Sequence, residues 1–140
     1  MDRLTKEQRS RTMSAVRGKD TKPEKKVRST LHRNGFRFSL HRKDLPGKPD
    51  LVLPKYRTVI FVHGCFWHGH DCPRGKRPAT RQEFWNEKLE KNKLRDVRNR
   101  GALEDLNWRV FVIWECCLEE GTDQVLDWLL KRRAKNLSAA

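Results

Sequence analysis

Cysteine and histidine are concentrated in one short segment and return near the end of the chain. Cys65, His70 and Cys72 fall within eight residues, and Cys116 and Cys117 come later. Thiolate and imidazole groups at such spacings are the ligands of a tetrahedral structural zinc site, which has no open coordination position. We therefore predict a closed Cys₃His site of Cys65, His70, Cys72 and one of the later pair. Spacing does not decide between those two, and Cys116 is preferred because it lies nearer a strand end. The alternative is that the cysteines are buried free thiols.

Carboxylates and histidines occupy the ends of two predicted strands. Asp50 begins an apolar strand directly after a Pro-Gly-Lys-Pro turn, His63 ends the next strand, and His68 lies five residues further on. Glu24 shares a helical stripe with apolar residues and is expected to face the sheet. Taken singly, each group has a simpler explanation, as a cap partner, a turn residue or a core histidine. Four such groups at one edge of a sheet favour a catalytic site.

Together these groups suit the hydrolysis of a phosphodiester. A hard divalent cation prefers carboxylate and carbonyl oxygens, which Asp50 and the backbone carbonyl of Val62 can supply. Such a cation neutralises charge on the scissile phosphate and lowers the pKa of the attacking water, which Glu24 is placed to hold. A neighbouring histidine can take up or supply a proton near pH 7.

The net charge indicates a polyanionic partner. The 140 residues include 32 Lys+Arg and 18 Asp+Glu, which leaves +14, and so basic a chain favours nucleic acid or an anionic membrane surface. No apolar run approaches the roughly 18 residues of a membrane span, and the first residues contain no signal-peptide core. We therefore predict a protein of the reducing cytoplasm, where clustered cysteine and histidine indicate metal binding rather than disulfides.

The chain is predicted to be one domain preceded by a basic arm. Residues 1–22 are rich in lysine and arginine, and residues 23–140 are expected to form a single α/β domain. Capping, periodicity and turn signals predict the elements in chain order. They are a helix from the Thr21–Glu24 capping box to Gly35, strands over 36–40, 50–53 and 58–63, a helix from a second capping box at Thr80–Glu83 to about Leu106 with Gly101 as a candidate break, a strand over 108–114, and a last helix capped by Thr122 or Asp123.

This order of elements predicts a small mixed β-sheet flanked by helices. A strand, a long helix and a strand in succession favour a right-handed crossover and a parallel pair, whereas the first three strands form a meander. If the strand ending at His63 and the last strand lie side by side in parallel, Cys65 and Cys116 arrive at the same edge of the sheet.

Several motifs of the chain resemble those of the very-short-patch repair endonucleases. They are Pro46-Gly-Lys-Pro-Asp50, His63-Gly-Cys-Phe-Trp-His68, the segment from Pro78 to Trp85, Trp114-Glu-Cys116 and, nearer the N-terminus, Arg11-Thr-Met13 and Asp20-Thr-Lys-Pro-Glu24. The resemblance covers roughly residues 5–118, and its Gly-Cys-Phe-Trp-His core is highly specific.

The resemblance implies a restriction-endonuclease-like fold, a structural zinc ion and magnesium-dependent catalysis. The implied substrate is double-stranded DNA with a T·G mismatch left by deamination of 5-methylcytosine, and the nick falls 5′ to the thymine. A cytosine-C5 methyltransferase is then a functional partner, and we expect a monomer that joins the bacterial nucleoid during repair. By position the resemblance makes Asp50 and the Val62 carbonyl the magnesium ligands, His63 and His68 the catalytic histidines, Glu24 the water-holding acid, and Cys65, His70, Cys72 and Cys116 the zinc ligands.

Three departures from the expected patterns stand out. Phe61 and His63 occupy the places of the acid and lysine usual in this nuclease fold, as they do in the repair family. Val62 stands where we expected threonine, which leaves a backbone carbonyl unchanged. Gly69 and Asp71 thin out a denser histidine run without altering the ligand spacing.

Aromatic and basic side chains are candidates for DNA contacts. Flat side chains can wedge between base pairs, because unstacking costs least at a mismatch. The resemblance assigns this intercalation to Phe66 and Trp67, with Trp85 alongside and Met13 approaching from the arm, whereas Phe84 is expected in the helix core. The candidate phosphate contacts are Arg74, Lys76, Arg77 and Arg81.

Two other functions fit the same residues. One is a zinc-stabilised DNA-binding module without catalysis, in which Asp50, His63 and His68 are structural. The other is a different nuclease of the same fold, of the junction-resolving or restriction kind, which shares the metal chemistry but not necessarily the aromatic wedge.

Overall fold

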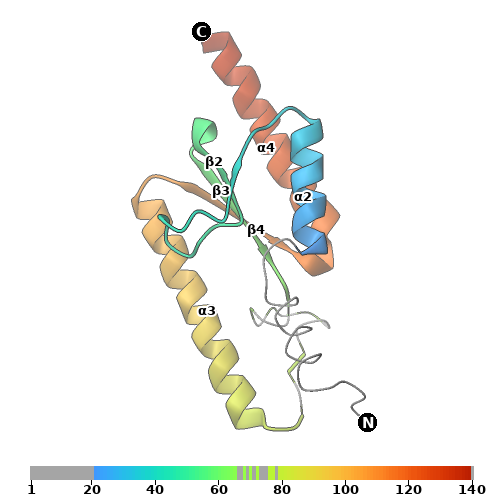
Figure 1. Cartoon of the computed structure of the whole chain (residues 1–140), viewed down its shortest axis with the longest axis vertical. Coiled ribbons are helices and arrows are strands. Elements are labelled where there is room, and N and C mark those ends of the chain that lie inside the picture. The colour runs from blue at the N-terminus through green and yellow to red at the C-terminus, as the bar shows by residue number, and fades with distance from the viewer. Residues whose placement is uncertain are drawn as a thin grey trace.

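The computed structural model describes residues 21–65, 68, 70, 72, 76, 77 and 79–139. A four-stranded mixed sheet lies between helices (Figure 1). Among the described residues, no helix has the length and apolar character needed to cross a membrane. The elements are helix α2 (Lys22–Arg33), strands β1 (Ser39–Leu40) and β2 (Leu51–Leu53), the 3₁₀ turn η1 (Pro54–Tyr56), strand β3 (Thr58–His63), helix α3 (Gln82–Asp105), strand β4 (Arg109–Trp114), the 3₁₀ turn η3 (Glu115–Cys117) and helix α4 (Leu118–Ala139).

The sheet has the predicted mixed topology. Its strand order is β1-β2-β3-β4; β2 is antiparallel to both β1 and β3, and β3 and β4 are parallel. The parallel register runs from Thr58 opposite Arg109 to His63 opposite Trp114. Cys65 and Cys116 therefore each follow two residues after this last matched pair, at the same edge of the sheet.

The two faces of the sheet are covered by different helices. Because side chains alternate along a strand, Ile60 packs in one buried cluster with residues of α2 and α4, while Val59 and Phe61 pack in a second cluster with Leu103 of α3. Figure 1 shows α3 apart from α2 and α4, which lie together. The C-terminal end of β3 thus lies between α2 on one side and α3 on the other, and both helices contribute to the site described below.

Helix α2 begins and ends as its sequence predicts. The Thr21 hydroxyl accepts a hydrogen bond from the Glu24 backbone N–H at 3.4 Å, and Pro23 occupies the first turn. Val27 and Leu31 are fully buried. Gly35, with a φ of +88°, follows the helix in a conformation that favours glycine. The helix includes Lys22, the last residue of the predicted basic arm; residues 1–20 lie outside the described part of the chain, so the division into arm and domain stays a prediction.

The elements differ from prediction in several places, and β2 and β4 each begin one residue later than predicted, at Leu51 and Arg109. The strand expected over 36–40 is reduced to Ser39–Leu40. The second capping box is wrong, because Arg81 is the N-cap residue of α3, has a φ of 53° and makes no side-chain capping bond. Helix α3 continues through Gly101, which adopts helical geometry. The last helix begins at Leu118 rather than at Thr122, because the 3₁₀ turn after β4 leads directly into it and the Thr122 hydroxyl donates to the Leu118 carbonyl at 2.7 Å.

Candidate active site

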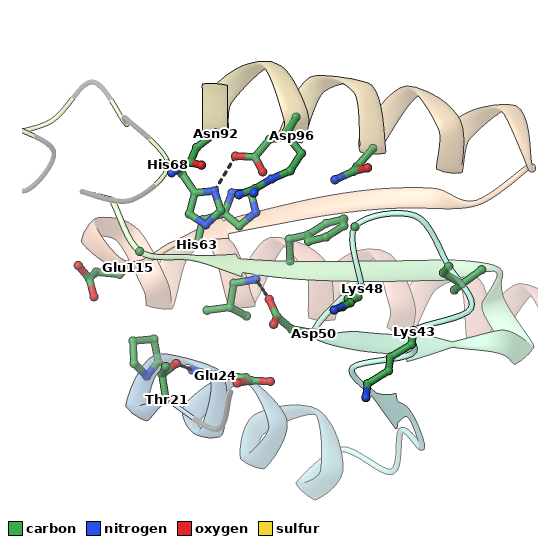
Figure 2. Close-up of a pocket in the computed structure, with 18 of the residues that line it drawn as sticks. Thr21, Glu24, Lys43, Lys48, Asp50, His63, His68, Asn92, Asp96 and Glu115 are labelled. Carbon is green, nitrogen blue, oxygen red and sulfur yellow. Dashed lines mark hydrogen bonds and ion pairs between the residues drawn. The ribbon is translucent and has the colours of Figure 1, made fainter. Parts of the chain in front are cut away.

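A cleft of about 1200 Å³ lies at the C-terminal end of β3. Its walls come from α2, the loop before β2, the end of β3 and α3, and Figure 2 shows their side chains converging on one space. All four predicted catalytic side chains line it: Glu24, Asp50, His63 and His68. Residues that lie far apart in sequence are therefore brought together as the topology required.

Asp50 lies just before β2 and is held against β3. Its Oδ2 accepts a hydrogen bond from the Val62 backbone N–H at 2.7 Å, beyond the last residue pair of β2 and β3. Burial raises the pKa of Asp50 to about 6, against the effect of the Val62 N–H bond and with a contribution from the neighbouring Glu24 carboxylate. A half-buried carboxylate whose ionisation is disfavoured suits a site that receives a cation.

Glu24 is only 2% exposed although it lies in the first turn of α2. Its Oε1 accepts a hydrogen bond from Arg28 at 2.8 Å, and it makes a short contact with Nε2 of His41. Figure 2 shows Glu24 and Asp50 side by side between α2 and the sheet. The carboxylate is thus part of the cleft in addition to any role in capping the helix.

His41 was not predicted as a site residue. It adopts a left-handed conformation with a φ of 48° and donates its backbone N–H to the Asp50 carbonyl at 3.3 Å. Its Nε2 lies 3.8 Å from Asp50 Oδ1. The alternation of apolar and polar residues over 36–40 predicted a strand just before His41. Only the pairing register of β1 with β2, however, places His41 opposite Asp50.

The two predicted catalytic histidines stack on each other. Their ring centroids lie 3.7 Å apart with an interplanar angle of 1°. His68 Nδ1 lies 2.5 Å from Asp96 Oδ2, a contact drawn in Figure 2. Burial and the neighbouring His68 lower the pKa of His63 to about 3, so His63 is neutral near pH 7. His63 Nδ1 is buried and has no hydrogen-bond partner among the described residues.

Asp96 is a second residue that the sequence did not reveal. It lies on α3 within a run of lysines and arginines that is typical of a solvated helix face. The apolar residues of α3 do not form a clear stripe along one side of the helix. Of its side chains, only Leu89 and Leu103 are buried. The side of α3 that faces the cleft could therefore not be identified from the sequence.

The predicted zinc ligands form one cluster. Donor atoms of Cys65, His70, Cys72 and Cys116 lie within 4.8 Å of one another. Cys116 Sγ lies 3.5 Å from His70 Nδ1, and the His70 ring stacks on Trp114 with centroids 4.0 Å apart. Local desolvation and the neighbouring thiols raise the pKa of Cys116 to about 12, and desolvation also raises the pKa of Cys65. Such thiols ionise readily only beside a cation, so the donor set fits zinc.

The basic residues that line the cleft are not those predicted. The lining includes Lys22, Lys43, Lys48, Lys88 and Arg95, from α2, the loop before β2 and α3. Of the predicted phosphate contacts, Arg77 pairs with Asn86 and Glu90, and the Arg81 guanidinium lies over the Phe84 ring. Neither of these residues nor Lys76 lines this cleft. The prediction that they contact phosphates is untested.

The predicted aromatic wedge is only partly described. Met13, Phe66, Trp67 and Arg74 lie outside the described residues. Trp85 lies near the start of α3, where its ring packs edge-to-face with Phe84 at 5.2 Å. The prediction that Phe84 belongs to the core is wrong, since this side chain is 44% exposed; it lies in the first turn of α3, before the helix reaches the sheet.

Comparison with known proteins finds one family. A family sequence model described as "DNA mismatch endonuclease Vsr" matches residues 1–74. The chain is 55% identical over 119 residues to "Type II nicking enzyme V.XorIIP" of Xanthomonas oryzae pv. oryzae, covering 85% of this chain and 88% of the relative. It is 47% identical over 125 residues to "DNA mismatch endonuclease Vsr" of Escherichia coli K12, covering 89% and 80%. It is also 47% identical over 118 residues to "Type II nicking enzyme V.NmeAIP" of Neisseria meningitidis, covering 84% of each.

Proposed function

The chain belongs to the Vsr family of DNA mismatch endonucleases, and from this premise we propose that it nicks one strand of mismatched double-stranded DNA. The specific substrate we propose is a T·G mismatch arising from deaminated 5-methylcytosine, nicked 5′ to the thymine to start very-short-patch repair. The single observation that carries the proposal is the convergence of Glu24, Asp50, His63 and His68 in one cleft lined by lysine and arginine. A basic cleft attracts the phosphate backbone, and the acid and imidazole groups line the same cleft.

We propose Mg²⁺ as the cation of this site, with Asp50 and the Val62 carbonyl as its ligands. The donor set fits a hard cation, because the half-buried Asp50 carboxylate has a raised pKa and a second carboxylate, Glu24, lies beside it. When bound, the cation supplies charge neutralisation at the scissile phosphate and acidifies the attacking water. The N–H of Val62 fixes one oxygen of Asp50, and the other oxygen, Oδ1, lies 3.8 Å from His41 Nε2.

The two histidines receive different tasks from their surroundings. His63 is neutral near pH 7 and holds its ring parallel to that of His68. His68 has a carboxylate partner, Asp96, at one ring nitrogen, so its other nitrogen is oriented for proton transfer to or from the reacting oxygen atoms. Glu24, buried in the first turn of α2, is proposed to hold the attacking water. Stacking of the two imidazoles limits the rotation of each ring.

The cysteine–histidine cluster is proposed to hold a structural zinc ion. Four protein donors fill a tetrahedral site, and the ligands come from the segment after β3 and from the turn after β4. A zinc ion there would tie the segment that carries His68 to the parallel strand pair. Phe66 and Trp67, in the same segment, are proposed to intercalate at the mismatch, with Trp85 and Met13 as further contacts.

The surrounding biology follows from the proposed substrate. The enzyme would act as a monomer on chromosomal DNA in the bacterial cytoplasm, and a cytosine-C5 methyltransferase would create the sites where its lesion arises. Lys76, Arg77, Arg81 and Arg74 remain proposed phosphate contacts.

A strand-specific nicking assay tests the proposal. Three labelled duplexes are incubated with and without Mg²⁺: one fully paired, one with a T·G mismatch in a CC(A/T)GG-type context, and a pre-nicked control. We expect a Mg²⁺-dependent cut on the thymine strand of the mismatched duplex and none with Asp50→Asn. Cutting of the paired duplex would indicate a restriction-like nuclease instead. Binding without cutting, unchanged by Asp50→Asn, would indicate a zinc-stabilised binding module.

A further inference from the structure

Two carboxylates and one imidazole meet on the α2 side of the cleft. Glu24, His41 and Asp50 each offer one ligand atom, and these three atoms all lie within 4.8 Å of one another. Glu24 is buried, and the side chains of His41 and Asp50 are 17% and 24% exposed. The His41 nitrogen contacts the Glu24 carboxylate and lies 3.8 Å from Asp50. Glu24 Oε1 also accepts a hydrogen bond from Arg28 at 2.8 Å, and the three side chains form a group that could face one cation.

The backbone holds His41 in this position. The residue takes a left-handed conformation with a φ of 48°, which histidine adopts more readily than most side chains but which still costs energy. Its N–H bonds to the carbonyl of Asp50 at 3.3 Å, so the ring and the carboxylate are fixed to each other through the main chain. Directly before it, Leu40 pairs with Leu51 in the β1–β2 register. The imidazole is therefore directed at the two carboxylates by the fold itself.

We infer that His41 is a nitrogen ligand of the cation held by Asp50 and the Val62 carbonyl, with Glu24 beside it, and that this site binds a transition-metal divalent cation, Mn²⁺ among them, more tightly than Mg²⁺. Mg²⁺ prefers oxygen ligands and gives up its water reluctantly, whereas imidazole nitrogen suits the first-row transition metals. His41, Asp50 and Glu24 lie on the α2 side of the cleft, so the α3 side, with His63 and His68, stays available to the DNA. The inference rests on the proposed role of Asp50 as a ligand of the catalytic cation.

A different role for His41 predicts different behaviour. If the ring only positions Glu24 through their contact, it never touches the cation, and its loss should weaken Mg²⁺ and Mn²⁺ binding alike. If it is a ligand, its loss removes one donor from Mn²⁺ and little from Mg²⁺. Direct detection of nitrogen bound to manganese distinguishes the two roles without any measurement of cleavage.

The experiment uses the full-length zinc-loaded protein and Mn²⁺ as the probe. Electron spin-echo envelope modulation measures coupling between Mn²⁺ and ¹⁴N, and titration followed by the free Mn²⁺ EPR signal gives affinity, with Mg²⁺ affinity obtained by competition. The variants are His41→Gln and, as a matched loss of one imidazole, His32→Gln, which changes an exposed residue of α2. We expect ¹⁴N coupling in the wild type and in His32→Gln and none in His41→Gln. His41→Gln should lower Mn²⁺ affinity by about tenfold or more while changing Mg²⁺ affinity by less than about twofold.

The inference would be overturned by the absence of ¹⁴N coupling in the wild type, or by coupling that persists in His41→Gln. An equal loss of affinity for both cations would do the same and would leave His41 as a positioning residue. The proposed nuclease function is tested separately by Mg²⁺-dependent nicking and by Asp50→Asn. Nicking that depends on Asp50 in a protein without the ¹⁴N signal would reject the ligand role of His41 alone, whereas nicking retained by Asp50→Asn would reject the proposed function.

Discussion

Asp96 of α3 and His68, which follows β3, are joined by a contact of 2.5 Å between Oδ2 and Nδ1. A carboxylate at Nδ1 fixes the tautomer and the orientation of the ring, so we expect Asp96 to act through His68 and not on the substrate. We predict that His68→Ala lowers kcat by about 10²–10⁴-fold. Asp96→Asn, which keeps an acceptor but removes the charge, should lower it by about 10–100-fold.

The positioning role is measured by a double variant in single-turnover nicking assays. Because Asp96 acts through the ring, His68→Ala combined with Asp96→Asn should be no slower than His68→Ala alone. Asp105→Asn, an exposed change at the end of the same helix, should leave the rate unchanged. Additive losses in the double variant would show that Asp96 has an independent task.

Asp50 is predicted to lower the stability of the protein in the absence of Mg²⁺. Its folded-state pKa of about 6 exceeds the ordinary value of 3.8, so the folded state binds more protons than the unfolded state between these values. The cost of the buried charge is therefore complete above pH 6 and disappears as the pH falls below about 4. Asp50→Asn should raise the free energy of unfolding at pH 8 by on the order of 2 kcal/mol, or Tm by roughly 5 °C.

Thermal unfolding of the zinc-loaded protein at pH 8 and pH 4, with and without Mg²⁺, checks this expectation. Mg²⁺ should stabilise the wild type and have little effect on Asp50→Asn, since ligand binding to the folded state raises Tm. A variant less stable than the wild type at pH 8 without Mg²⁺ would mean that the carboxylate is needed by the fold for another reason.

The sequence was sufficient for the parts of the site that depend on local pattern and on topology. The parallel pairing of β3 and β4 followed from a strand, a long helix and a strand, and it brought Cys65 and Cys116 to one edge. Asp50 and His63 converge for the same reason, because each stands at the end of a short strand. Local signals at Thr21 correctly predicted the start of α2.

The parts that could not be predicted depend on contacts between distant segments. His41 reaches Asp50 through a two-residue strand pairing and a loop in which His41, Gly47 and Lys48 all have positive φ. No periodicity in the sequence specifies such a loop. Asp96 faces the site because α3 crosses one face of the sheet, but its weak apolar pattern does not reveal which of its sides is turned inward.

Cys116 and Cys117 are adjacent in sequence but differ in their relation to the proposed zinc site. Cys116 belongs to the cluster with Cys65, His70 and Cys72, and Cys117 does not. The sulfur atom of Cys117 lies 4.0 Å from that of Cys116. Cys116→Ser should therefore lose zinc, measured as metal per protein by mass spectrometry, while Cys117→Ser retains it. Since structural zinc contributes on the order of 10 kcal/mol in small domains, its loss should lower Tm sharply. Unchanged melting after verified zinc removal would argue against a structural role.

Replacement by alanine is expected to lower the free energy of unfolding at Gly47 and to raise it at Gly101. A Cβ at Gly47 would lie 2.9 Å from Asn99 Cβ, and its φ of +77° is strained for alanine, so Gly47→Ala should cost at least about 1–2 kcal/mol. Gly101 lies within α3 with nothing within 4 Å of an added Cβ, so Gly101→Ala should add about 0.5–1 kcal/mol. Chemical denaturation measures both values. Because Gly47 precedes Lys48 in the cleft wall, Gly47→Ala should also weaken DNA binding, and unchanged binding would show that the loop adapts.

Lys48 and Arg95 line the cleft from the loop before β2 and from α3, so both are predicted to contact DNA phosphates. Each contact releases counterions, and a protein that engages about six phosphates should bind with a log–log salt slope near −5. Lys48→Ala and Arg95→Ala should each reduce the magnitude of that slope by about one and weaken binding to paired and mismatched duplexes alike. Lys131→Ala is the control, since Lys131 is exposed on α4 and pairs with Asp127 at 2.9 Å. Fluorescence anisotropy without divalent cations, over a series of salt concentrations, gives the slopes. If only the control changes the slope, the DNA lies across α4 and not in the cleft.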